Sequence, residues 1–214
     1  MNNYKFELII GPMSCGKTEE LLRRLKRAVI ANKKVKVFSP SVDTRVLADC
    51  IQSRNGTCSK ALKIKTALEI MDFVEDSDEI VAIDELQFFD ENILKVIRSL
   101  VASGKKVIGT GLELDFKEEP FGYMPQLLCH ADKIDKLTAI CMKCGSEYAV
   151  RTQRLIDGEP AEIDSPLIMI GGDETYEARC RNCFEINNKH HYQINDTDKK
   201  QTPNQLSEYS FMHS

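Results

Sequence analysis

The sequence predicts an α/β fold in which a parallel sheet is followed by a small metal-binding domain. Over residues 1–138, short apolar runs alternate with helical patterns, which is typical of a parallel sheet with covering helices. A glycine-rich loop joins the first apolar run to the first helix. Further along, two Cys-x-x-Cys pairs replace the strand–helix alternation, and such pairs indicate a domain organised around a metal ion.

Five segments are expected to be strands. The hydrophobicity of the first four is continuous rather than alternating, as in Ile80-Val81-Ala82-Ile83, and this pattern is typical of parallel strands covered on both faces. The fifth is expected at an edge of the sheet. The predicted strands are Lys5–Ile10, Val35–Ser39, Glu79–Asp84, Lys106–Gly111 and Ile134–Ile140.

Two helices are expected from the 3.6-residue spacing of apolar side chains. The second helix, Glu91–Ala102, ends at Ser103-Gly104, a common way for a helix to stop. The first helix, Thr18–Ala31, has an apolar stripe made by Leu21, Leu22, Leu25, Ala28 and Val29. Its basic side chains are expected to form a solvated face: Arg23, Arg24, Lys26 and Arg27.

Residues 11–18 match the phosphate-binding pattern Gly-x-x-x-x-Gly-Lys-Ser/Thr at every fixed position. They lie between a predicted strand and a predicted helix, which is the context that the pattern requires. In such a loop, backbone N–H groups surround the phosphates, Lys17 reaches the β- and γ-phosphates, and the Thr18 hydroxyl binds Mg²⁺. We therefore expect a P-loop NTPase-like domain; the alternative is a plain glycine turn. The expected nucleotide-binding residues are Gly11, Pro12, Met13, Ser14, Cys15, Gly16, Lys17 and Thr18.

Asp84 and Glu85 follow a predicted buried strand. The carboxyl end of such a strand lies beside the phosphate loop, where ligands bind in open α/β sheets. A carboxylate at Asp84 would hold Mg²⁺ together with Thr18, and Glu85 would orient or deprotonate the attacking nucleophile. The alternative is a strand that merely ends in acidic residues. Arg45, in the segment Asp43-Thr44-Arg45, is either a charge-stabilising arginine or an exposed loop residue.

Four cysteines form two Cys-x-x-Cys pairs, Cys141 with Cys144 and Cys180 with Cys183. Four thiolates suit a tetrahedral Zn²⁺ site without an open position, so the metal is expected to be structural. A pair of redox-active dithiols is the competing interpretation. The other four cysteines are expected to act mainly as small apolar side chains: Cys15, Cys50, Cys58 and Cys129.

Composition narrows the class of protein. The formal net charge is −4 and there is no long basic block, which disfavours nucleic acid as the main partner. No apolar run reaches the ~18–20 residues that span a bilayer, and the N-terminus does not read as a signal peptide, so we expect a cytoplasmic protein with no membrane partner. The expected regions are a nucleotide-binding domain 1–138, a zinc-binding domain 139–192 and a polar, disordered tail 193–214.

These motifs together resemble the zinc-containing, cytosolic-type (type II) thymidine kinases. The resemblance is carried by residues 11–21, 43–45, 84–89, 111–112, 115–116, 119–122, 141–144, 152–155 and 171–181. It implies transfer of the γ-phosphoryl group of ATP to the 5′-hydroxyl of thymidine, and more weakly of deoxyuridine, in pyrimidine deoxynucleotide salvage for DNA synthesis. It also implies a homotetramer, feedback inhibition by thymidine triphosphate, and a zinc ribbon that carries a lasso loop over the base.

The resemblance assigns roles to individual residues of this chain. Glu85 is expected to be the general base and Arg45 to assist catalysis, while Asp84 and Gln87 join the nucleotide-binding set. The expected nucleoside-binding residues are Met13, Asp43, Leu112, Phe116, Phe121, Thr152, Gly171, Gly172 and Tyr176. The last four belong to the lasso loop, which is expected to bind thymine largely through backbone groups, since thymine offers one N–H donor between two carbonyl acceptors.

Two positions depart from the family pattern: Glu113 stands where aspartate is usual, and Glu118 stands where glycine is usual. A side chain at a glycine position can alter the loop conformation. We therefore expect these two substitutions to affect substrate affinity and selectivity rather than the chemistry. Two other function classes stay open from sequence alone. One is a nucleic-acid-stimulated ATPase, and the other is a nucleotide sensor without catalytic activity.

Overall fold

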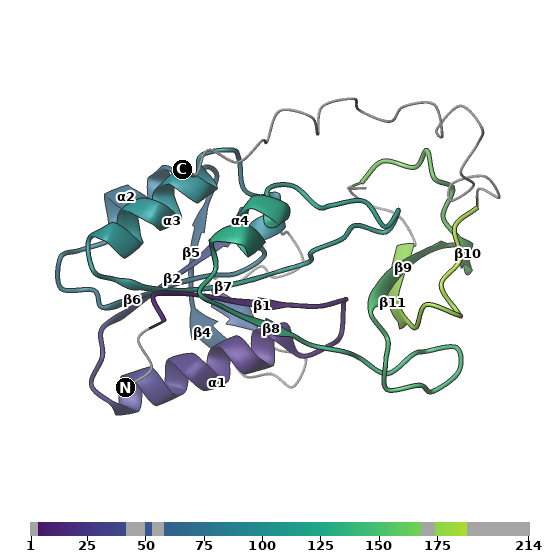
Figure 1. Cartoon of the computed structure of the whole chain (residues 1–214), viewed down its shortest axis with the longest axis horizontal. Helices are drawn as coiled ribbons and strands as arrows, with labels where there is room; N and C mark the ends of the chain where they lie inside the picture. Colours follow the sequence, from purple (N-terminus) through teal and green to yellow (C-terminus); the bar gives the residue numbers. More distant parts are fainter. Residues whose placement is uncertain (1–3, 42–49, 53–57, 168–173, 188–214) are drawn as a thin grey trace, which may run out of the picture.

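The computed structural model describes residues 4–41, 50–52, 58–167 and 174–187. The predicted tail, 193–214, lies outside the described residues. Within the described part, the chain forms a six-stranded sheet, a three-stranded sheet and a two-stranded hairpin. Figure 1 shows the three-stranded sheet standing beyond the end of the main sheet.

The main sheet has the order β5-β2-β6-β7-β1-β8, and every pair in it is parallel. This confirms the predicted parallel α/β sheet. The strand predicted at Ile134–Ile140 is indeed at an edge, although it begins earlier and is shorter. The bounds are β1 Phe6–Ile10, β2 Val35–Pro40, β5 Leu62–Ile64, β6 Ile80–Ile83, β7 Lys106–Gly111 and β8 Lys133–Lys136.

Helices cover both faces of this sheet (Figure 1). Helix α1, Lys17–Ile30, packs on one face, where Leu21, Leu22 and Leu25 join β1, β2, β6 and β7 in one buried cluster. The opposite face is covered by α2 Glu69–Phe73, the short 3-10 helix η1 Leu86–Phe88, α3 Ile93–Ala102 and α4 Met124–His130. Burial on both faces explains why the central strands are apolar at nearly every position.

Glu7 is the exception to the apolar pattern of β1, and it is buried with 6% exposure. Arg24 of α1 donates hydrogen bonds to Glu7 (2.7 Å), Glu20 (2.8 Å) and Asp135 (2.6 Å), and Lys106 donates to Glu7 as well. The predicted solvated basic face is therefore wrong for Arg24, whose side chain is only 12% exposed. The Arg24 side chain thus connects α1 to the buried Glu7 carboxylate of β1.

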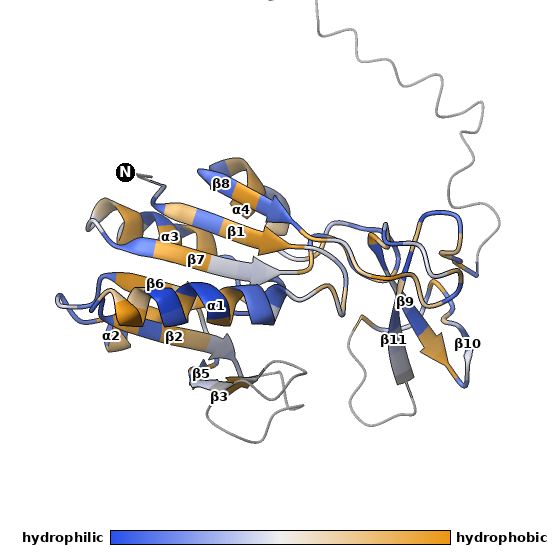
Figure 2. Cartoon of the chain, turned by 90° about the horizontal axis from the view of Figure 1, so that it is seen from below, coloured by the Kyte–Doolittle hydropathy of each residue, from blue (hydrophilic) through white to orange (hydrophobic). Residues whose placement is uncertain are grey.

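The hydropathy colouring in Figure 2 shows the hydrophilic residues of α1 among hydrophobic ones. Arg23, Lys26 and Arg27 are exposed, as predicted. Val29, expected on the buried stripe, is 61% exposed instead. It lies in the last turn of the helix.

The three-stranded sheet has the order β10-β9-β11 and is antiparallel. Its strands are β9 Arg151–Ile156, β10 Glu159–Pro160 and β11 Glu174–Arg179. The first five residues of β9 are all buried, so this strand lies inside the molecule rather than at its surface. The remaining hairpin pairs β3 Cys50–Gln52 with β4 Cys58–Lys60. Among the described helices, none is both long and apolar enough to cross a membrane.

Candidate functional site

The phosphate loop runs from the end of β1 to the start of α1. Gly11 has φ 141°, and a β-carbon there would lie 2.5 Å from the carbonyl oxygen of Leu137, so only glycine fits this close approach. Gly16 is the residue before α1 and is left-handed, with φ 87°. The loop therefore directs the chain from strand to helix as the motif predicts, and the helix N-terminus faces the space that the loop encloses.

Lys17 is buried, with 8% exposure. Its Nζ donates hydrogen bonds to the carbonyl oxygens of Gly11 (2.9 Å) and Pro12 (2.7 Å). The ammonium group thus lies within the loop itself, where phosphate oxygens would compete for it. Thr18, in the first turn of α1, is half-buried.

Asp84 lies at the carboxyl end of β6 and is 7% exposed. Its Oδ1 accepts hydrogen bonds from the Thr110 hydroxyl and from the backbone N–H of Glu85. Burial, together with the nearby Glu85 carboxylate, raises the pKa of Asp84 to about 7. A buried carboxylate beside a second one is stabilised by a cation, so the carboxylates at this edge of the sheet fit the chemistry of a divalent cation.

Glu85 has an unusual backbone conformation, with φ 50° and ψ 50°. This left-handed conformation is uncommon for a residue other than glycine. The side chain of Gln87 donates a hydrogen bond to Glu85 Oε2, and the Gln87 carbonyl oxygen Oε1 accepts one from the N–H of Leu112 (3.0 Å). Gln87 therefore connects the Glu85 carboxylate to the segment that carries the predicted nucleoside residues.

Three predicted nucleoside residues lie on the segment after β7. Leu112 and Phe116 are buried, with 9% and 7% exposure, and Phe121 packs edge-to-face against Phe88 with ring centroids 5.4 Å apart. The guanidinium of Arg154 lies 5.0 Å from the Phe116 ring centroid and 6.0 Å from the Tyr176 centroid. Phe116 of this segment and Tyr176 of β11 thus meet at one buried arginine.

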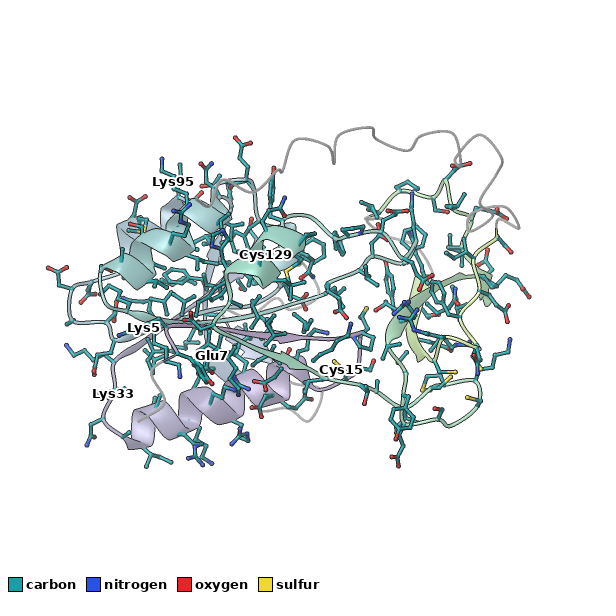
Figure 3. The ribbon with its side chains drawn as sticks, viewed as in Figure 1. Lys5, Glu7, Cys15, Lys33, Lys95 and Cys129 are labelled. Atoms are coloured by element: carbon teal, nitrogen blue, oxygen red, sulfur yellow. The ribbon has the colours of Figure 1, made fainter. Side chains whose placement is uncertain are left out.

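Thr152 connects β9 of the three-stranded sheet to the phosphate loop. Its hydroxyl accepts a hydrogen bond of 3.0 Å from the backbone N–H of Met13 in the phosphate loop. Cys15 packs against the small buried cluster that contains Cys141 and Cys180, one cysteine from each Cys-x-x-Cys pair. Figure 3, where Cys15 is labelled, shows it at the end of the main sheet that faces β9 and β11. Burial raises the pKa of the Cys15 thiol.

The four cysteines of the two pairs gather at one point. Cys141, Cys144, Cys180 and Cys183 place their sulfur atoms within 4.8 Å of one another, and the Cys144 and Cys180 sulfurs are 3.8 Å apart. Zn–S bonds of about 2.3 Å in a tetrahedron separate the sulfurs by about 3.8 Å. The contact is between different pairs, which favours one shared metal site over two separate dithiols.

Backbone hydrogen bonds shape each Cys-x-x-Cys pair. Cys141 O accepts from Gly145 N (2.8 Å), and Cys180 O accepts from Cys183 N (3.0 Å) and from Phe184 N (3.0 Å). The side chain of Gln153 adds two hydrogen bonds to the backbone of Glu185. The cysteines are therefore already oriented toward one centre, so the donor set fits a structural zinc ion.

Two departures from the family pattern are explained by the structure. Glu118 has φ 63°, which is the conformation that favours glycine, and its carboxylate pairs with Arg151 of β9. Glu113 is buried, with its Oε1 3.0 Å from Lys136 Nζ. Both changes keep a charged partner nearby rather than leaving an isolated buried carboxylate.

Some predicted site residues lie outside the described residues: Asp43, Arg45, Gly171 and Gly172. Sequence reasoning missed Thr110, which bonds Asp84, and gave no role to Arg151 or Arg154. The sequence could have indicated a role for Thr110, since it is a polar residue at the end of a buried strand, between two glycines. The roles of the two arginines depend on contacts across the sheets, which no local pattern reveals.

Comparison with known proteins identifies the family. Residues 4–184 match the family model described as thymidine kinase. Among solved structures, a Holliday junction branch migration motor RuvB from Thermotoga maritima aligns with 14% identity and a TM-score of 0.36, over 63% of this chain and 38% of that chain. That alignment is too weak to bear on function. The family match spans both the phosphate loop and the cysteine cluster, and the chain therefore belongs to the thymidine kinase family, whose members are nucleoside kinases.

Proposed function

We propose that this protein transfers the γ-phosphoryl group of ATP to the 5′-hydroxyl of thymidine, and more weakly of deoxyuridine. The product, thymidine monophosphate, would enter pyrimidine deoxynucleotide salvage for DNA synthesis. The observation that carries the proposal is the position of Glu85. Glu85 directly follows Asp84, and its backbone N–H donates a hydrogen bond to the Asp84 carboxylate. The Glu85 carboxylate accepts a hydrogen bond from Gln87, and the Gln87 side chain in turn accepts one from Leu112 on the nucleoside segment.

In the proposed reaction, Glu85 accepts the proton of the 5′-hydroxyl as that oxygen attacks the γ-phosphorus. The bond from the γ-phosphorus to the β,γ-bridging oxygen breaks, and ADP leaves. Lys17 and the N–H groups of the phosphate loop stabilise the phosphate oxygens. Thr18 and Asp84 are the residues that would hold Mg²⁺, and the ion would supply positive charge to the phosphates. Arg45 remains our sequence-based candidate for stabilising the transferred group.

The nucleoside is proposed to bind between the segment after β7 and the three-stranded sheet. Leu112 and Met13 offer apolar contacts for the 5-methyl group of thymine. Phe116, Phe121, Thr152 and Tyr176 complete the described wall. Backbone groups near Gly171 and Gly172 are proposed to bind the base edge, and Asp43 to contact the substrate; these three assignments rest on the sequence resemblance.

Zinc is proposed to be structural, because four cysteine ligands leave no open position for a reacting group. By connecting two segments of chain it would preorganise the lasso loop and lower the entropy cost of substrate binding. Homotetramer formation, inhibition by thymidine triphosphate and a cytoplasmic location are further proposals that rest on the family resemblance.

The test is ADP release by purified protein with Mg-ATP and each natural nucleoside in turn. Water alone and single-stranded DNA serve as controls. We expect ADP with thymidine, less with deoxyuridine, and only background with the controls. Turnover of a different nucleoside would overturn the specificity, and ADP release stimulated by DNA would point to a nucleic-acid ATPase instead. The absence of any turnover would point to a nucleotide sensor.

A further inference from the structure

The backbone of Glu118 is strained in a conformation that glycine would adopt without strain. Its backbone has φ 63°, in the left-handed region where a β-carbon is strained. The side chain that causes this strain also forms a contact: the carboxylate accepts a hydrogen bond from Arg151 Nε. The two side chains are 17% and 7% exposed, so solvent screens their attraction only in part.

The ion pair joins the two segments that carry the described nucleoside wall. Phe116 is two residues before Glu118 on the segment after β7. Thr152 directly follows Arg151 on β9. The same two segments meet again where the Arg154 guanidinium lies 5.0 Å from the Phe116 ring centroid. The Glu118–Arg151 pair therefore connects the segment that carries Phe116 to the strand that carries Thr152.

Hydrogen bonds within residues 115–119 hold the segment around Glu118 in one turn, so a displacement of one residue shifts the others. Asp115 Oδ1 accepts hydrogen bonds from the N–H groups of Lys117 (2.8 Å) and Glu119 (3.0 Å). Asp115 N–H in turn donates to the Glu119 carbonyl (2.9 Å). Phe116 lies inside this turn, and a shift of Glu118 relative to β9 displaces its ring.

We infer that the Glu118–Arg151 ion pair positions the nucleoside pocket of this chain and sets its affinity for the nucleoside. The inference rests on the proposed function. Glu118 and Arg151 are positioning residues, since they act through Phe116 and Thr152 rather than on the reacting atoms. Their loss changes nucleoside binding and leaves the phosphate loop intact.

The informative variant is Glu118→Gly, because it removes the carboxylate and relieves the backbone strain at once. We expect its Tm to equal or exceed that of the wild type. Its KM for thymidine rises by roughly 5- to 20-fold, while kcat and the KM for ATP stay within about twofold. Glu119→Gln is the matched control, because it makes the same charge change on the same turn at an exposed residue and leaves the KM for thymidine unchanged.

A double-mutant cycle with Glu118→Gln and Arg151→Met tests whether the two residues act together. If they do, the KM change of the double variant is smaller than the product of the two single changes. Independent, multiplicative effects would overturn the pairing.

The outcomes separate this inference from the proposed function. A wild type that phosphorylates thymidine, with an unchanged KM in Glu118→Gly, overturns the inference alone. So does a Glu118→Gly variant in which Tm falls and kcat falls with it, since the pair is then only a support of the fold. A wild type that does not phosphorylate thymidine overturns the proposed function itself.

Discussion

Glu85 combines a strained backbone with a fixed carboxylate. A left-handed conformation costs a residue with a side chain about 1–3 kcal/mol. In return, the chain turns sharply after β6, and the Glu85 side chain comes within hydrogen-bonding distance of Gln87. Such strain often occurs where a side chain must be held for chemistry.

Replacing Glu85 by Gln should remove the proton acceptor while keeping the size of the side chain. We expect kcat to fall by about 10²–10⁴-fold, with ATP affinity largely kept. Steady-state kinetics and a nucleotide-binding titration check both parts. Glu91→Gln, at an exposed residue nearby, is the control and should behave like wild type. A Glu85→Gln enzyme of full activity would mean that another group is the base.

Gly122 is expected to be essential for the position of Gln87. It has φ 52°, and a β-carbon there would lie 2.5 Å from the Gln87 carbonyl oxygen. Gly122→Ala should therefore lower kcat by displacing Gln87, as well as lowering Tm. Gly158→Ala is a matched control, because Gly158 also has a positive φ, 85°, but nothing within 4 Å of the added atom.

Gly158→Ala should lower the free energy of unfolding only by the cost of a left-handed backbone conformation, about 1–2 kcal/mol, with kcat unchanged. Thermal melts and kinetics of the two variants make the comparison. Equal kcat values for both variants would contradict the role given to Gly122.

At the residue scale, sequence reasoning succeeded where a motif fixes spacing. The phosphate loop and the cysteine pairs are local patterns, and their predicted geometry is found. It failed for Arg24, which looked like one of four solvated basic residues but reaches a buried glutamate seventeen positions earlier. A partner on a different element leaves no trace in the local charge pattern.

Helix α1 carries an ion pair that should depend on pH. A hydrogen bond from Arg23, and a further one from Arg24, lower the pKa of Glu20 from 4.5 to about 2. Since the folded protein binds this proton more weakly than the unfolded chain, the carboxylate stabilises the fold above pH 4.5. That stabilisation declines as the pH falls from 4.5 toward 2.

Glu20→Gln should therefore lower the free energy of unfolding at pH 7 by about 0.2–1 kcal/mol, because the pair is partly exposed. The difference from wild type should narrow between pH 5 and pH 3. Urea unfolding across this range is the measurement. Asp72→Asn, in the first turn of α2 at an exposed residue, is the control, and a gap that stays constant with pH would contradict the linkage.

The cysteine cluster should hold zinc in the purified protein. Cys144→Ser removes one of four ligands, so we expect zinc content well below one ion per chain, a lower Tm and a higher KM for thymidine. Cys129 was expected from the sequence to act as a small apolar side chain, but it is exposed. Cys129→Ser is the control, because this cysteine lies outside the cluster. Metal analysis and melting curves check the prediction, and unchanged zinc content in Cys144→Ser would exclude the site.

At the element scale, the sequence predicted the helices and strands that have long apolar patterns, and it did not predict the shortest elements. The predicted helix Glu91–Ala102 is found as Ile93–Ala102. Helix α2 has five residues and β5 has three, too few for a periodic pattern to stand out. These elements form because neighbouring parts of the fold bury them, and that contribution is not local.

The three-stranded sheet is expected to influence the binding of both substrates. Thr152 belongs to β9, yet its hydroxyl bonds the phosphate-loop N–H of Met13 at 3.0 Å. Thr152→Val keeps the shape and removes this acceptor. We expect the KM for ATP to rise by roughly 3- to 10-fold, in line with the loss of one hydrogen bond.

Thr152→Ser gives the discriminating comparison. It keeps the hydroxyl and loses the methyl group, so it should preserve the KM for ATP while raising that for thymidine. Kinetics with each substrate varied in turn make the test. If Thr152→Val leaves the KM for ATP unchanged, the hydrogen bond does not support the phosphate loop.

At the scale of the whole molecule, the sequence indicated a parallel sheet but not the order of its strands. The continuous apolar runs of β1 and β7 look alike, and neither says which strands are neighbours. The order β5-β2-β6-β7-β1-β8 depends on how the connecting helices cross the sheet. The hydrogen bond between Met13 of the phosphate loop and Thr152 of β9 joins parts of the chain 139 residues apart, so no local pattern reveals it.

The strand order also has a consequence during synthesis on the ribosome. β1 is made first, but Phe6 pairs with Val107 and Glu7 with Lys133. At 5–20 residues per second, roughly 5–20 s pass before the first of these partners is translated. For that time the nascent chain exposes Phe6-Glu7-Leu8-Ile9-Ile10, and the charge of Glu7, later paired with Arg24, then serves to keep this apolar segment from aggregating.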